Sequence, residues 1–275
     1  MIRLLIGAAL LGALLAPLPS MSEETGVYMI AKSEPEQPVK AEPPANKPAA
    51  ANNAAKGLTL DEVLRNYYRA IGGLGSWQSV NTLVIEGKIL SQKREFTTTA
   101  EYMRPDKCRV EYSIGGKLVI QAYNGETAWQ QNPISDKPSP EPLDRARTNY
   151  LSDRCGIESP LINYAKKKHK VSLEGMESVD GKETYKIKVT YPTGNFQFYF
   201  LDAATFLPLK TIGFYTVEGS EIVMMTKFED YRKTGNVVVP FRLAIDKKGG
   251  GPHEDYVVES VILNSPLDPG IFNMP

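Results

Sequence analysis

From Thr82 onward the sequence alternates apolar and polar side chains with a period of two residues, most regularly over residues 107–114 and 184–191. This period is typical of strands that bury one face and expose the other. Turn signals such as Asn124-Gly125 separate the runs. We therefore expect eleven or twelve antiparallel strands up to Asn264, and a sheet of that size should curl.

The first 56 residues have a different composition. Arg3 and the apolar run over residues 4–15 predict a signal peptide at residues 1–22, cleaved near Ser22. The run is too short to span a membrane, although an uncleaved anchor is the alternative. Residues 23–56 are rich in Pro, Ala, Lys and Glu, which predicts a disordered linker. The folded domain should then cover residues 57–275 of an exported protein.

Two segments of this domain depart from the strand period. Thr59 and Glu62 form a capping box ahead of apolar residues at helical spacing, which predicts an N-terminal helix. Residues 138–168 begin with three prolines and contain two candidate short helices, the second after Pro160. We expect this segment to form a lid over the concave face of the sheet. The apolar residues expected to pack the lid are Leu143, Tyr150, Leu151, Leu161 and Ile162.

The inward positions of the predicted strands supply many large apolar side chains. A sheet curled at a large radius can enclose a lumen that its own side chains do not fill. An acyl chain fits such a space, because each buried CH₂ contributes about 0.8 kcal/mol. An ordinary tightly packed core is the alternative. The candidate lumen residues are Ile85, Ile89, Tyr102, Val110, Tyr112, Ile114, Ile120, Trp129, Tyr185, Ile187, Phe198, Met224, Phe228 and Phe241.

Charge and motifs argue against several other classes of protein. The 32 basic and 32 acidic residues balance, and no basic face of the kind that binds nucleic acid is evident. The sequence lacks a nucleophile elbow, a phosphate loop and a dinucleotide fingerprint, so we expect neither an enzyme nor a cofactor. Cys108 and Cys155 have no metal-ligand spacing. In an exported protein they form either a disulfide or two buried thiols.

Several short motifs resemble the outer-membrane lipoprotein carrier (LolA-like) family. They are Arg104-Pro105-Asp106 before an alternating strand, residues 123–129 with Asn132-Pro133, and residues 199–202 with residues 207–210. The resemblance implies a mainly β (α+β) fold, an unclosed antiparallel barrel of about eleven strands with a helical lid, located in the periplasm. It also implies a ligand that is a lipid or a lipid-modified protein. Because relatives of this fold include envelope sensors and an enzyme, the fold does not fix the function.

The resemblance carries over one residue role. Arg104 matches the family's arginine that holds the lid shut by hydrogen bonds to the backbone of a lid helix; a rim arginine paired with a carboxylate is the alternative. Cys108 and the long linker depart from the carrier pattern. We therefore expect a monomeric protein that binds a lipid or a lipoprotein. A more specific expectation is that it carries this ligand to the outer membrane, from an inner-membrane partner protein to an outer-membrane one. The alternatives are a protein-binding regulatory module and an enzyme that uses the barrel as a pocket.

Overall fold

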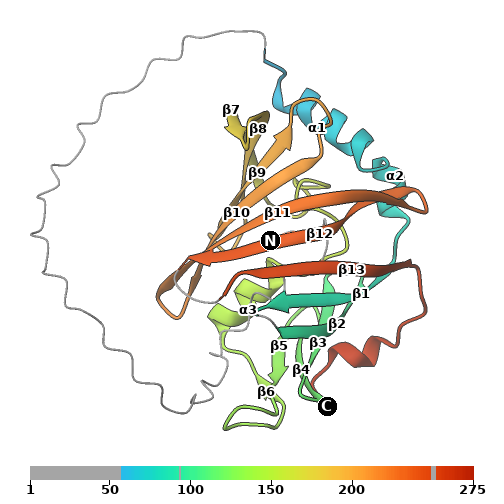
Figure 1. Ribbon diagram of the computed structural model, residues 1–275, viewed down its shortest axis with the longest axis vertical. Coiled ribbons are helices and arrows are strands. Elements are labelled where there is room, and N and C mark those ends of the chain that lie inside the picture. The colour runs from blue at the N-terminus through green and yellow to red at the C-terminus, as the bar shows by residue number, and fades with distance from the viewer. Residues whose placement is uncertain (1–56, 93, 249–251) are drawn as a thin grey trace, which may run out of the picture.

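The computed structural model describes residues 57–92, 94–248 and 252–275. The predicted signal peptide at residues 1–22 and the predicted linker at residues 23–56 lie outside these residues, so both stay predictions. Figure 1 shows a strongly twisted sheet with a few short helices beside it.

In the described part of the chain, thirteen strands form one antiparallel sheet in the order β6-β5-β4-β3-β2-β1-β13-β12-β11-β10-β9-β8-β7. The edge strands β6 and β7 lie far apart, so the barrel is unclosed, which confirms the predicted fold class (Figure 1). The strands are β1 (Thr82–Ser91), β2 (Arg94–Met103), β3 (Lys107–Ile114), β4 (Lys117–Tyr123), β5 (Ala128–Gln131), β6 (Glu141–Pro142), β7 (Lys170–Val179), β8 (Lys182–Thr190), β9 (Phe196–Asp202), β10 (Pro208–Val217), β11 (Ser220–Thr234), β12 (Val237–Lys248) and β13 (Glu254–Leu263).

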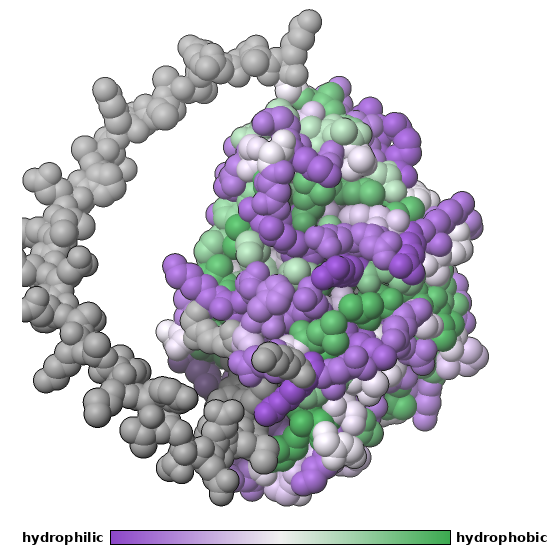
Figure 2. All heavy atoms as spheres, in the orientation of Figure 1, coloured by the Kyte–Doolittle hydropathy of each residue, from purple (hydrophilic) through white to green (hydrophobic). Residues whose placement is uncertain are grey.

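The two faces of the sheet differ as the alternation predicts. On β3, Cys108, Val110 and Tyr112 are buried on the concave face, whereas Arg109 and Glu111 between them lie on the convex face and are partly exposed. The concave face, the N-terminal helices and the lid form the main hydrophobic core. Figure 2 shows one side of the molecule, where hydrophilic and hydrophobic side chains are interleaved.

Two helices precede the sheet, α1 (Leu60–Ala70) and α2 (Leu74–Gln78). The capping box of Thr59 and Glu62 is present at the start of α1, as the sequence predicts. Gly72 follows α1 with a φ of 102°, and a Cβ there would lie 2.1 Å from the carbonyl oxygen of Asn236. Glycine therefore lets the end of α1 dock directly against the turn between β11 and β12.

The lid begins with α3 (Arg145–Ser152), whose first turn is capped by the Asp144 side chain. The helix approaches β4 and β5 on one side and β10 on the other. The second candidate helix is wrong, because residues 160–168 form successive turns. Asn163 has a φ of 52°, and a left-handed residue at this point interrupts a helix that could otherwise have started after Pro160. The start of the predicted lid is also different, since Glu141 and Pro142 form β6.

The chain ends on the convex face of the sheet. After β13, the 3₁₀ helix η2 (Pro269–Phe272) reaches strands β3 to β5. The indole nitrogen Nε1 of Trp129 donates to the carbonyl oxygen of Phe272 at 2.9 Å, and Phe272 is fully buried. A second, smaller apolar cluster of Ile120, Ala122 and Trp129 lies under this tail.

Candidate functional site

The concave interior between the sheet and the lid holds most of the predicted lumen residues. Ile85, Tyr102 and Ile187 are completely inaccessible to solvent. Since a fully inaccessible side chain has no water-sized space beside it, these side chains pack against their neighbours rather than line an open void. The predicted residues in or against this core are Ile85, Ile89, Tyr102, Val110, Tyr112, Ile114, Tyr185, Ile187, Met224, Phe228 and Phe241.

The placement of Ile120 and Trp129 in the lumen is wrong. Val119 and Gln121 are the residues of β4 that lie opposite the inward Tyr112 and Val110, so Ile120 faces outward. Trp129 pairs with Ala122 on the same outward face. Both residues are apolar because the C-terminal tail covers this part of the convex face, which gives β4 two buried faces.

The placement of Phe198 in the lumen is also wrong. Strand β9 has apolar side chains on both of its faces, so its sequence does not show which face points inward. Its pairing with β8 puts Tyr199 and Leu201 opposite the inward Ile187 and Tyr185. Phe198 therefore lies on the convex face, with Phe196 and Phe214. Three lysines place their ammonium groups within 6 Å of these rings or of the Phe200 ring: Lys186, Lys188 and Lys210.

The lid packs onto the core through the residues expected from the sequence. Tyr150, Leu151, Leu161 and Ile162 are buried in the main core, and Leu143 is partly buried against it. Helix α1 also contacts the lid, because the hydroxyl of Tyr68 donates to the carbonyl oxygen of Leu161 at 2.7 Å. The lid is thus packed between the sheet and α1 in this closed arrangement.

Arg104 joins α2 to the lid. Its Nε and Nη2 atoms each donate at 2.7 Å to a backbone carbonyl, that of Val80 and that of Trp77 respectively. Nη2 also donates to Oε2 of Glu158 in the lid at 2.9 Å. The contact therefore combines elements of both expectations: the backbone acceptors belong to the end of α2 rather than to a lid helix, and the lid contributes a carboxylate. A guanidinium suits this position because carbonyls at a helix end lack intrahelical partners.

Glu158 is the buried member of this contact, with its side chain 4% exposed. Nζ of Lys167 lies 2.8 Å from its Oε1. Burial alone would raise the pKa of Glu158, but Lys167 and Arg104 together hold that pKa below the usual value. The carboxylate is therefore charged at neutral pH and pairs with Arg104, just after β2, and with Lys167 of the lid itself.

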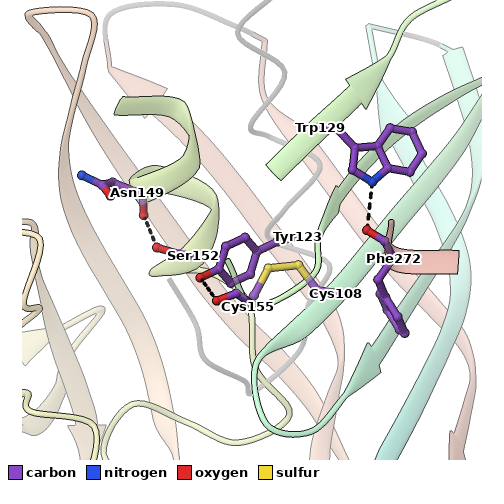
Figure 3. Close-up of a disulfide and its surroundings, with 8 residues drawn as sticks. Cys108, Tyr123, Trp129, Asn149, Ser152, Cys155 and Phe272 are labelled. Atoms are coloured by element: carbon purple, nitrogen blue, oxygen red, sulfur yellow. Dashed lines mark hydrogen bonds between the residues drawn. A yellow bond between two sulfur atoms is a disulfide. The ribbon is translucent and has the colours of Figure 1, made fainter. Parts of the chain in front are cut away.

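A disulfide joins Cys108 of β3 to Cys155, just after α3 (Figure 3). The two Cα atoms are 5.4 Å apart and the two residues are 47 positions apart in the chain. Both cysteines are fully buried. The bond fixes one point of the lid to the concave face, so any opening of the lid must pivot around it.

Sequence reasoning missed Arg154, which is fully buried beside the disulfide. Its Nη1 donates to the hydroxyl of Tyr150 at 3.1 Å, and its guanidinium lies over the rings of Tyr150 and Tyr215. Burial lowers its pKa. The available signal is its place next to Cys155, since a residue adjoining a buried disulfide lies near the interior whatever its charge.

We compared the chain with known proteins. No protein-family model and no curated protein matches the sequence. Among solved structures, a LolA superfamily protein from Nitrosomonas europaea matches with a TM-score of 0.53 and 14% identity, over 79% of this chain and 98% of that one. The chain has the LolA-like fold.

Two further structures share this LolA-like fold with the chain. A putative outer membrane lipoprotein-sorting protein domain from Vibrio parahaemolyticus has a TM-score of 0.52 and 11% identity, over 77% of this chain and 95% of that one. A DUF1329 family protein from Desulfovibrio piger has a TM-score of 0.53 and 10% identity, over 78% of this chain and 97% of that one. At these identities the likeness concerns the fold alone.

The LolA-like sheet of this chain also carries a groove on its convex face, with a volume of about 490 Å³. The Arg109 side chain crosses this groove. Its guanidinium lies over the Trp129 ring and pairs with Glu111, and its Nη1 donates to the carbonyl oxygen of Ile271 at 3.0 Å. Burial raises the pKa of Glu101 in its wall, and nearby Glu111 adds to this. The groove is separated from the lid by the full thickness of the sheet.

Among residues 57–92, 94–248 and 252–275, no group of three or more His, Cys, Asp or Glu side chains is placed to hold a metal ion. Within the same ranges, each helix is too short or too polar to cross a bilayer.

Proposed function

We propose that this protein is a non-catalytic binding protein that holds the acyl chain of a lipid, or of a lipid-modified protein, on the concave face of its sheet beneath the lid. The observation that supports the proposal most directly is that the lid covers the core without being part of the sheet. The segment from α3 to residue 168 covers the largest apolar surface of the molecule, yet within the described residues it forms no strand of the sheet.

The closed interior requires movement before a ligand can enter. Side chains such as Ile187 and Leu161 are inaccessible, so an acyl chain takes the place that lid residues occupy now. The polar contacts that join the lid to the rest of the domain include those of Glu158 with Arg104 and of Asp153 with Thr193 and Asn195, together with one disulfide. The ion pair and the hydrogen bonds can be exchanged for others when the lid moves, whereas the disulfide and the hydrogen-bonded sheet stay intact.

The cellular setting belongs to the same proposal. We place the protein in the periplasm, because residues 1–22 read as an export signal and the disulfide requires an oxidising compartment. The shared fold with the putative outer membrane lipoprotein-sorting protein domain from Vibrio parahaemolyticus supports this setting. Transport of the ligand between inner- and outer-membrane partners is the finer form of the proposal.

The test measures binding of an uncharged apolar reporter to the delipidated protein. We expect N-phenyl-1-naphthylamine to become fluorescent on binding and hexadecanol to displace it. Hydrogen–deuterium exchange should then change in α3, in residues 153–168 and in β8, which face the interior. The C-terminal tail over residues 269–275 is the internal control, because it covers the opposite face of the sheet.

The outcomes separate the candidate functions. Saturable binding with exchange changes confined to the lid and the concave face supports the proposal. Absence of binding, or exchange changes confined to the convex groove near Arg109, contradicts it. In that case a protein-binding module or an enzyme becomes the better candidate, and a protein partner would be sought instead.

A further inference from the structure

The interior beneath the lid contains a charge that its neighbours do not neutralise. Arg154 is fully buried, and its Nε and Nη2 atoms have no hydrogen-bond partner among the described residues. Its Nη1 contacts the hydroxyl of Tyr150 at 3.1 Å and the Met224 sulfur at 3.3 Å. A buried cation without an anionic partner costs several kcal/mol, so such a residue is retained where something offsets that cost.

Unpartnered hydroxyl groups lie in the same part of the interior. The hydroxyls of Tyr102 and Tyr256 are buried without a hydrogen-bond partner among the described residues, and both residues are fully inaccessible. Arg154 is close enough to Tyr102 to lower the pKa of its hydroxyl, against a larger increase caused by burial. The interior therefore holds several hydrogen-bond donors within a mainly apolar surface, a composition that suits a ligand with one polar end.

The neighbouring charged groups have partners of their own. Lys247 and Glu254 face the same interior and pair with each other, with 3.3 Å between Nζ and Oε1. Their charges cancel, and the buried Asp153 carboxylate next to Arg154 accepts from Thr193 and Asn195. The Nε and Nη2 donors of Arg154 are thus left for an anion.

The disulfide keeps Arg154 near these hydroxyls when the lid opens. Cys155 follows Arg154 directly and is bonded to Cys108, and Cys108 lies opposite Tyr102 in the pairing of β2 with β3. The rest of the lid can move away while Arg154 remains beside Tyr102. The donors then become accessible without being separated.

From this arrangement we infer that Arg154, with the hydroxyl of Tyr102, binds the anionic oxygen group at the end of the apolar ligand. The inference rests on the proposed function and names its ligand class, an acidic amphiphile with a carboxylate or phosphate head. The guanidinium provides a fork of donors that matches either group. The acyl chain would extend from this point along the concave face.

The experiment compares three ligands with the same sixteen-carbon chain on the purified full-length protein. Palmitate, hexadecyl phosphate and hexadecanol each displace N-phenyl-1-naphthylamine, at concentrations below their aggregation limits. We expect the two anions to bind at least tenfold more tightly than the alcohol, which corresponds to about 1.4 kcal/mol. The anion that binds more tightly identifies the head group.

Variants assign the preference to Arg154. Arg154→Gln should bind all three ligands with the affinity of the alcohol, and Tyr102→Phe should reduce the preference for anions while removing only an unpaired hydroxyl. Arg145→Gln is the matched control, because Arg145 lies exposed in the same lid segment, at the start of α3. It should keep the full preference.

The outcomes distinguish failure of the anion site from failure of lipid binding as a whole. If the wild-type protein binds the alcohol and both anions equally, or if Arg154→Gln and Tyr102→Phe both fold and keep the preference, the anion site is refuted while the lipid-binding function stands. If none of the three ligands displaces the reporter, the proposed function itself is refuted. Should Arg154→Gln fail to fold, the wild-type comparison and Tyr102→Phe still decide the question.

Discussion

The disulfide between Cys108 and Cys155 should make a large contribution to stability, and its size can be estimated from the chain. The bond closes a loop across 47 positions of sequence. In the chain-entropy model, a loop of this length removes enough freedom from the unfolded state to stabilise the folded state by about 4 kcal/mol at 25 °C. For a domain of roughly 200 residues, this corresponds to a melting temperature about 10 °C higher.

The assay is urea unfolding of the same protein with the bond intact and after reduction under denaturing conditions and refolding in reductant. This comparison leaves every side chain in place, so it separates the cross-link from packing. The double variant Cys108→Ala, Cys155→Ala serves as a second measure and should lose somewhat more, because both sulfur atoms are buried. Hydrogen exchange in residues 153–157 should rise in the reduced protein.

Two results would refute this reasoning. Titration of two free thiols in denatured, unreduced protein would show that the bond does not form. A difference in unfolding free energy of less than about 1 kcal/mol between oxidised and reduced protein would show that the unfolded chain is already constrained, contrary to the model.

Three further predictions follow from the lid and the tail. Arg104→Met should lower the unfolding free energy by about 2–3 kcal/mol and accelerate ligand exchange, because it removes one of the two cations that pair with the buried Glu158 carboxylate; unchanged stability and exchange would show that Arg104 does not hold the lid shut. Since the folded-state pKa of Glu158 is lowered, its ion pairs stabilise the protein above pH 4.5 and are lost as the pH falls through the folded pKa; urea midpoints measured against pH should fall less steeply in Glu158→Gln. Trp129→Ala should cost about 3–5 kcal/mol of stability in thermal or urea unfolding yet leave the ligand affinity of the folded protein unchanged, because Trp129 packs on the convex face.

The strands and their inward faces could be predicted wherever polar residues alternated with apolar ones. Over residues 107–114 only one parity is apolar, and Val110 and Tyr112 lie in the core as that pattern requires. In β9 both parities are apolar, so the sequence of that strand leaves its inward face undetermined. The register with β8 decided it and turned Phe198 outward.

The convex cluster could not be predicted because it depends on a distant segment. Ile120 and Trp129 are buried because the tail around Phe272 covers them, and Phe272 follows them in the chain by more than 140 positions. Arg154 was missed for a similar reason. Apart from its place next to Cys155, nothing in the sequence distinguishes it from the exposed Arg145, and its burial results from the disulfide and from aromatic rings on α3 and β10.

The free edge at β7 bears on how an open sheet avoids joining its neighbours. An unpaired strand is a template on which a second chain can add, and a sheet that does not close must protect each end. Most of β7 is solvent-exposed, yet a bulge between Leu173 and Gly175 interrupts its regular register, and Glu174 places a negative charge at the bulge. Two such edges would meet with mismatched hydrogen bonds and like charges. The molecule can thus keep the gap that a mobile lid needs without becoming a seed for fibrils.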